Sequence, residues 1–77
     1  MNRVDALSLL KELRAVFFSL EDAQIVTVTK EKKTDNWFLC AKWIPEENEK
    51  PALTSIAFKC RVEISEERGY TCFRSSP

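Results

Sequence analysis

The chain has 77 residues, the length of one small domain, and its 12 Lys and Arg balance its 12 Asp and Glu to a formal net charge of zero. This neutrality disfavours a dedicated duplex-binding protein, because such proteins use an excess of cations to neutralise phosphates. The sequence contains no histidine, which excludes Ser-His-Asp and Cys-His catalysis and most zinc sites.

Residues 3–20 have the period of an amphipathic helix. Apolar side chains recur every three or four residues, at Val4, Leu7, Leu10, Leu13, Phe17 and Leu20. Leu9 and Val16 widen this stripe, while Asn2 and Asp5 supply an N-cap and a first-turn carboxylate. Charged residues interrupt every apolar run of the segment, so we expect neither a targeting segment nor a membrane-spanning helix.

Two strands are expected next, over residues 24–32 and 36–44, joined by a turn at 33–36. The first segment, QIVTVTKEK, is rich in β-branched residues and alternates between apolar and polar. The second segment, NWFLCAKWI, is apolar at almost every position, and Pro45 ends it because proline cannot donate to a strand ladder.

The length of the turn decides which side chains of the second strand face the core. With an even number of residues in the turn, Trp43 lies near Val26 and Ala41 near Val28. The inner face then carries Val26, Val28, Leu39, Ala41 and Trp43, with Trp37 near the turn. The outer face carries Ile25, Phe38, Cys40, Lys42 and Ile44. An odd-length turn is the less favoured alternative, because it would mix polar and apolar side chains on both faces.

The rest of the sequence predicts a loop and two further strands. Residues 45–51 form a polar, acidic loop between two prolines. Residues 53–65 alternate with period two, and one side carries Thr54, Ile56, Phe58, Cys60, Val62 and Ile64. A helix is the alternative there, but it would separate Phe58 and Val62 from the other apolar side chains. Gly69 marks a turn before a fourth strand over 70–75.

These elements predict an α+β fold for a single domain over residues 1–77. One N-terminal helix packs on a four-stranded antiparallel β-meander, in the order αββββ. One helix covers only one face of the sheet, so the outer face is expected to stay open. We expect Lys59 and Arg61 to lie on that outer face beside the second strand.

The three cysteines, Cys40, Cys60 and Cys72, are odd in number and lack the spacing of a metal site. We expect reduced thiols that act as small core side chains in a cytoplasmic protein. Lys42, two residues after Cys40, would favour a reactive thiolate, although a buried filler is the favoured interpretation of that cysteine. We expect no metal and no cofactor, because the acidic loop residues Glu46, Glu47 and Glu49 lack the ligand spacing and the glycine of a calcium loop.

The first functional hypothesis is a small non-catalytic protein–protein interaction module, an inhibitor or adaptor that occupies a surface of a larger protein. One form of it is a phage or mobile-element factor that blocks a host protein. The residues expected to contact the partner are Phe38, Cys40, Lys42, Ile44, Lys59, Arg61, Glu46, Glu47 and Glu49. No residue is expected to be catalytic, so the chain is not expected to be an enzyme.

Two alternatives remain open for the outer face. A single-stranded nucleic-acid-binding sheet would stack bases on aromatic side chains between cations. That function would use Trp37, Trp43, Lys42, Lys59 and Arg61 and is disfavoured by the zero net charge. The other alternative is a structural homodimer, in which a second copy covers the open face. A solvated surface with no partner is the competing explanation for scattered apolar residues.

Overall fold

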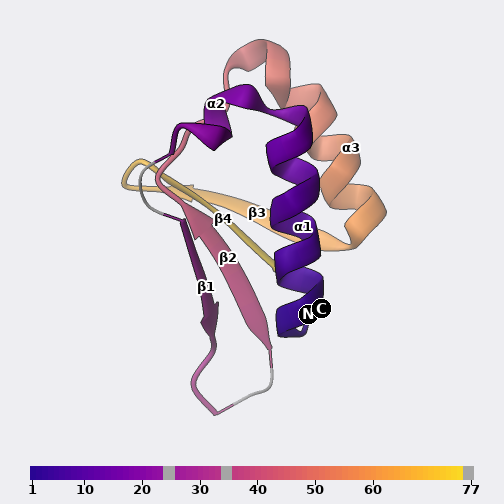
Figure 1. Cartoon of the computed structure of the whole chain (residues 1–77), viewed down its shortest axis with the longest axis vertical. Helices are drawn as coiled ribbons and strands as arrows, with labels where there is room; N and C mark the ends of the chain where they lie inside the picture. Colours follow the sequence, from indigo (N-terminus) through magenta and orange to yellow (C-terminus); the bar gives the residue numbers. More distant parts are fainter. Residues whose placement is uncertain (24–25, 34–35, 76–77) are drawn as a thin grey trace.

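A computed structural model of the chain describes residues 1–23, 26–33 and 36–75. It has an N-terminal helix, a further long helix and a four-stranded antiparallel sheet (Figure 1). The predicted α+β fold with an N-terminal helix on such a sheet is therefore confirmed. The predicted first residues of the first strand, including Ile25, and the centre of the turn at 33–36 lie outside the described residues.

The first helix, α1, covers Arg3–Val16 and begins as predicted. The Asn2 side chain accepts a hydrogen bond from the Asp5 backbone amide at 2.8 Å, which satisfies one of the free amides of the first turn. The prediction of one helix through residue 20 is wrong. The backbone of Phe17 is extended, with φ −112° and ψ 99°, and a separate short helix, α2, covers Phe18–Glu21.

The first hairpin pairs β1, Val26–Lys30, with β2, Trp37–Ala41. Val26 lies opposite Ala41 and Val28 opposite Leu39, so the register differs by two residues from the predicted one. A shift of two leaves every side chain on the predicted face, because the period of a strand is two. Leu39, Ala41 and the following Trp43 are accordingly buried.

The predicted strand over 53–65 is wrong in its first two thirds. A short 3₁₀ helix, η1, covers Glu47–Glu49 and leads into α3, Lys50–Cys60. Pro51 occupies the first turn of α3, where its missing amide is harmless. The helix buries Leu53 and Ala57 and partly buries Ile56 and Cys60, a stripe with helical spacing.

The chain then forms a second hairpin from β3, Val62–Glu67, and β4, Tyr70–Ser75. Arg68 and Gly69 form the two-residue turn with φ of 53° and 82°. Positive φ at both positions is the requirement of the type I′ turn that joins tightly twisted strands. The predicted fourth strand and the predicted role of Gly69 are thus confirmed.

The strand order in the sheet is β1-β2-β4-β3, so the predicted meander is wrong. The helix α3 carries the chain from β2 past the position of β4 to the edge, and the second hairpin then brings β4 back beside β2. The chain therefore consists of two halves of the same kind. The first half is α1 with β1 and β2, the second half is α3 with β3 and β4, and the β2–β4 pair is the seam between them.

The core lies between the helices and one face of the sheet, which we call the inner face. Its central row runs across all four strands through Val28, Leu39, Phe73 and Ile64. Phe73 and Leu39 are each only 1% exposed. Leu9 and Leu13 of α1 and Leu53 and Ala57 of α3 belong to the same buried cluster.

A disulfide links Cys40 of β2 to Cys72 of β4, across the seam and on the outer face. The prediction of three reduced thiols is therefore wrong for this pair, and Cys60 is the remaining free thiol. The reason is topological. A meander would separate the second and fourth strands, whereas the observed order makes them neighbours and sets the two cysteines opposite each other.

Candidate interaction surfaces

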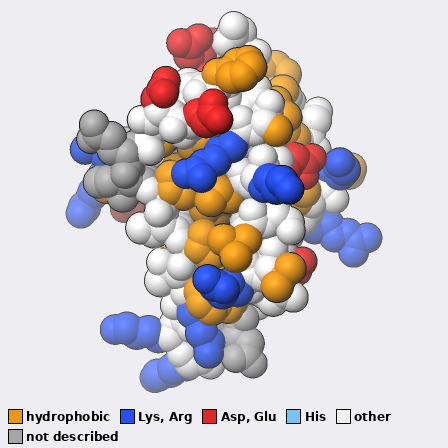
Figure 2. Space-filling model, in the orientation of Figure 1, with side chains coloured by type: hydrophobic (Ala, Val, Ile, Leu, Met, Phe, Trp, Pro, Cys, Tyr) orange, Lys and Arg blue, Asp and Glu red, His pale blue; other side chains and the backbone are white. Residues whose placement is uncertain are grey.

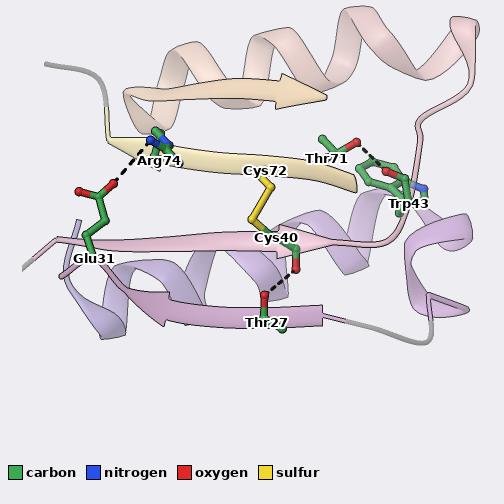
Figure 3. Close-up of a disulfide and its surroundings, with 7 residues drawn as sticks. All are labelled: Thr27, Glu31, Cys40, Trp43, Thr71, Cys72 and Arg74. Carbon is green, nitrogen blue, oxygen red and sulfur yellow. Dashed lines mark hydrogen bonds and ion pairs between the residues drawn. A yellow bond between two sulfur atoms is a disulfide. The ribbon is translucent and has the colours of Figure 1, made fainter. Parts of the chain in front are cut away.

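The outer face of the sheet holds only some of the residues predicted to lie there. Phe38 and Cys40 are on it, both half-buried, and the exposed Lys42 and Ile44 follow the end of β2. The Arg74 guanidinium carbon lies 5.5 Å from the centre of the Phe38 ring, and its Nη1 is 3.6 Å from Glu31 Oε1. Figure 3 shows this ion pair beside the disulfide. The aromatic surface at this position is thus partly covered by a cation.

Lys59 and Arg61 do not lie on the outer face, which corrects their predicted position. Both were placed there by the strand prediction, but Lys59 belongs to the last turn of α3. Its Nζ is 3.3 Å from Glu12 Oε1 of α1. Arg61 ends α3 in a left-handed conformation and donates its backbone amide to the carbonyl oxygens of Ala57 and Phe58.

The acidic loop has a structural explanation. Glu46 and Glu49 form a capping box in which each side chain accepts a hydrogen bond from the other residue's backbone amide. Glu47 pairs with Lys50 at 3.5 Å. Carboxylates near a helix N-terminus interact favourably with the helix dipole. Glu46, Glu47 and Glu49 therefore stabilise the start of η1 and of α3, which follows it. Their predicted partner contact stays a prediction.

The two tryptophans lie on the helix side of the sheet, as predicted from the favoured parity. Trp43 is buried, and its ring centre lies 5.5 Å from that of Phe17 with the two planes tilted by 43°. It donates its indole N–H to Ser19 Oγ at 2.8 Å. Trp37 is half-buried and pairs with Lys30 of β1. Neither indole is placed to stack bases on the open outer face.

An exposed apolar surface that the sequence did not predict lies on α1. Val4 is 70% exposed and Leu7 40%, although both were assigned to the buried stripe together with the half-exposed Val16. The helix instead buries Ala6, Leu9 and Leu13. The side of α1 that carries Val4 and Leu7 also carries Lys11 and Arg14, by helical spacing, with Arg3 beside them.

We call the surface formed by Arg3, Val4, Leu7, Lys11 and Arg14 the α1 face. Phe18, the first residue of α2, follows the end of α1 in the chain and is 78% exposed. Figure 2 shows apolar side chains interleaved with Lys and Arg over α1, and further apolar surface toward α2. Among the described residues, no ion pair involves Arg3, Lys11 or Arg14. The sequence did contain a sign of this exposed surface. The apolar residues from Val4 to Val16 are too many for one side of a helix, so some of them had to lie outside the core.

A groove of about 340 Å³ lies on the other flank of α1, toward the end of α3. It is lined by Met1, Asp5, Ser8, Leu9, Glu12, Cys60 and Val62. Burial and the neighbouring Glu12 carboxylate raise the pKa of the Cys60 thiol, and Lys59 opposes them only in part. A thiol held protonated in this way is a poor nucleophile. Among the described residues there is also no cluster of three metal-ligating side chains.

Comparisons with protein-family models, with curated proteins and with solved structures found no match for this chain. None of the helices in the described part of the chain is long and apolar enough to span a membrane.

Proposed function

We propose that this protein is a small non-catalytic interaction module, an inhibitor or adaptor that binds a larger protein through the α1 face. The observation that carries the proposal is the exposure of Val4 and Leu7 among Arg3, Lys11 and Arg14, for which the described residues provide no ion-pair partner. Phe18, just past the end of α1, adds a third exposed apolar side chain. In a chain this short, buried apolar area is scarce, because a domain of this size buries only about 60% of its unfolded surface. Large apolar side chains that stay outside the core beside cations without a described ion-pair partner are therefore candidates for contact with a partner, whereas a single exposed side chain such as Phe58 is ordinary surface.

The charges of α1 indicate what kind of partner fits. Arg3, Lys11 and Arg14 lie around the exposed apolar residues, whereas Asp5 and Glu12 line the groove toward α3. Arg3 also stands in the first turn, where the helix dipole disfavours a cation, so helix stability does not explain its position. The complementary surface is a protein segment that presents apolar side chains flanked by Asp or Glu.

The outer sheet face is the weaker candidate surface for the same function. Its main apolar side chain, Phe38, is half-buried and partly covered by Arg74. The centre of the face is the disulfide, which lies between the hydroxyl side chains of Thr27 and Ser65. The nucleic-acid alternative also loses support, because the residues that it needs lie elsewhere. Trp43 is buried, and Lys59 and Arg61 are on α3 and its end.

The expected cytoplasmic location rested on three reduced thiols, and the Cys40–Cys72 disulfide removes that argument. Disulfides persist mainly in oxidising compartments, and those in the cytosol are usually transient. The proposed function does not depend on the compartment, since the α1 face contains no cysteine.

The experiment compares charge variants on the α1 face and an apolar variant at Phe18 with matched variants elsewhere. Proteins that bind the wild-type chain in an extract of its source cells are identified by mass spectrometry, purified, and titrated by calorimetry. We expect Lys11→Glu/Arg14→Glu and Phe18→Ser each to weaken binding by about tenfold or more. The controls are Lys32→Glu/Lys33→Glu at the tip of the first hairpin and Phe58→Ser on α3, all exposed positions.

Equal affinity of these variants and the controls would overturn the proposal, provided that circular dichroism shows each variant folded. Three further measurements separate the alternatives. A concentration-independent dimer by light scattering would favour the homodimer. Binding to phosphatidylserine vesicles would assign the α1 face to an anionic lipid surface, and anisotropy of a labelled oligonucleotide would reveal nucleic-acid binding.

A further inference from the structure

The Cys40–Cys72 disulfide lies at the centre of the outer face, where it bridges the two inner strands of the sheet (Figure 3). The two cysteines are direct partners across β2 and β4, with 4.1 Å between their Cα atoms. This short spacing is typical of the non-hydrogen-bonded pairs of an antiparallel ladder. The sulfurs therefore stand on the sheet surface, on the opposite side from the helices.

Small side chains flank the disulfide within its row across the sheet. Cys40 and Cys72 are each half-buried, and the side chains next to them in the same row are the exposed hydroxyls of Thr27 and Ser65. Thr27 turns its hydroxyl toward the Cys40 carbonyl oxygen, at 3.5 Å. Thiol–disulfide exchange requires that a thiolate reach a sulfur, and small neighbours permit this approach.

The two cysteines also sit in the same five-residue pattern, which sequence analysis did not detect as a repeat. The segments Phe38–Lys42 and Tyr70–Arg74 both read aromatic, any residue, Cys, any residue, cation. In the antiparallel pair of β2 and β4, the aromatic residue of the first segment, Phe38, lies opposite the cation of the second, Arg74. Each cysteine thus has a cation two residues later, and a nearby cation stabilises a thiolate.

We propose that Cys40–Cys72 is a thiol–disulfide exchange site that a dithiol reductant opens in the native protein. A thiolate of the reductant attacks one cysteine sulfur, a mixed disulfide forms, and the other cysteine leaves as a thiolate. The second thiol of the reductant then breaks the mixed disulfide. The products are two cysteine thiols and the oxidised, cyclic reductant, so two electrons and two protons pass to the protein.

The fold beneath the site can persist through this reaction. The neighbouring inner residues Leu39 and Phe73 pair directly with each other and are both almost completely buried. Their packing involves neither sulfur, and the backbone ladder between β2 and β4 is independent of the bridge. This separation lets the bond open and close without global unfolding.

The test measures the rate of reduction in the Cys60→Ser background, which removes the third thiol. Dithiothreitol is added at several concentrations at neutral pH, samples are quenched with iodoacetamide, and the alkylated cysteines are counted by mass spectrometry. We expect a rate that is proportional to the concentration of dithiothreitol and unchanged by urea below the unfolding transition, with an unchanged far-ultraviolet circular dichroism spectrum. A rate that rises with urea in step with the unfolded fraction, or that stays constant as the dithiothreitol concentration increases, would overturn the proposal, because the bond would then open only after unfolding.

The cation is tested with Lys42→Gln, and the matched control is Lys11→Gln on the opposite side of the molecule. Removing the unit charge two residues from Cys40 should slow reduction roughly two- to threefold at low salt. The control should react at the wild-type rate. Equal rates for the two variants would overturn the role assigned to Lys42.

Discussion

The two halves of the molecule have the same order of elements, a helix followed by a hairpin, but their helices form for different reasons. The helix α1 begins at the side-chain N-cap of Asn2 and contains four leucines, which are good helix formers. The helix α3 contains Thr54, Ile56 and Phe58, which favour strands. Its helical state is supported by Pro51 in the first turn, by the capping box of η1 directly before it, and by the burial of Leu53 and Ala57. The comparison teaches that the start of a helix and its tertiary packing can outweigh the internal preference of its residues.

The largest expected effect separates two phenylalanines of the second half. Phe73 is 1% exposed in the central core row, whereas Phe58 on α3 is 86% exposed. We expect Phe73→Ala to lower the free energy of unfolding by about 3–5 kcal/mol. Phe58→Ala should change it by less than about 0.5 kcal/mol. Urea denaturation of both variants makes the measurement, and similar losses would mean that Phe58 is in the core, as the predicted strand required.

The disulfide contributes the next largest effect, because it joins the two halves across the seam. Cys40 and Cys72 are 32 residues apart in the sequence. Closing a loop of that length in the unfolded chain is expected to stabilise the fold by about 3–4 kcal/mol on the chain-entropy model. The double variant Cys40→Ala/Cys72→Ala should therefore unfold at a lower urea concentration than Cys60→Ala. Equal midpoints for the two variants would mean that the bond does not restrict the unfolded chain.

The same contrast explains which parts of the fold the sequence predicted. Most of the first half followed its pattern, since Asn2 caps α1 and the parity of the first hairpin places Leu39 and Ala41 inside, although α1 ends at Val16 and not at residue 20. The second half was predicted wrongly because Ile56, Phe58 and Cys60 are spaced by two, as in a strand. The buried side of the actual helix instead includes the small residue Ala57. Once α3 was read as a strand, β4 could not be placed beside β2. That single error therefore also prevented prediction of the disulfide and of the positions of Lys59 and Arg61.

The candidate surfaces were predicted less well than the fold, for a related reason. The apolar residues Val4 and Leu7 satisfy the helical period, and nothing in a periodic pattern shows which of two adjacent stripes meets the sheet. The choice is made by tertiary packing, which favours Ala6, Leu9 and Leu13 against the inner face. The outer face was predicted correctly for Phe38 and Cys40 because strand parity alone decides it.

A smaller effect distinguishes the end of α3 from the interior of α1. Arg61 has φ 55° and ψ 48°, a conformation that glycine adopts without the steric cost of a Cβ atom. Arg61→Gly should therefore stabilise the fold by about 0.5–1 kcal/mol. Arg14→Gly, within α1, should destabilise it by about 1 kcal/mol. Thermal melts of the two variants should move in opposite directions, and destabilisation by both would show that Arg61 makes a contact worth more than its strain.

The smallest expected effect is a change in the reactivity of Cys60, which tests the contact between α3 and α1. Its thiol lies 3.8 Å from Glu12 Oε2 of α1, and burial together with that carboxylate raises its pKa above the ordinary value of 9.0. Glu12→Gln should lower the pKa and speed alkylation of Cys60 at pH 8, whereas Lys59→Gln should slow it, because Lys59 lowers the pKa. Iodoacetamide labelling, followed by mass spectrometry, measures both rates, and the disulfide-bonded pair does not interfere unless a reductant is present.

The same shift fixes the sign of a pH effect on stability. The unfolded chain releases the Cys60 proton at a lower pH than the folded chain does, so above about pH 9 the unfolded state binds fewer protons. The free energy of unfolding should therefore decline as the pH rises through that range, and Cys60→Ser should remove this part of the decline. Urea titrations at pH 7 and pH 10 on the wild type and the variant provide the comparison. A wild-type protein that loses no more stability than Cys60→Ser would show that α1 and α3 do not enclose the thiol.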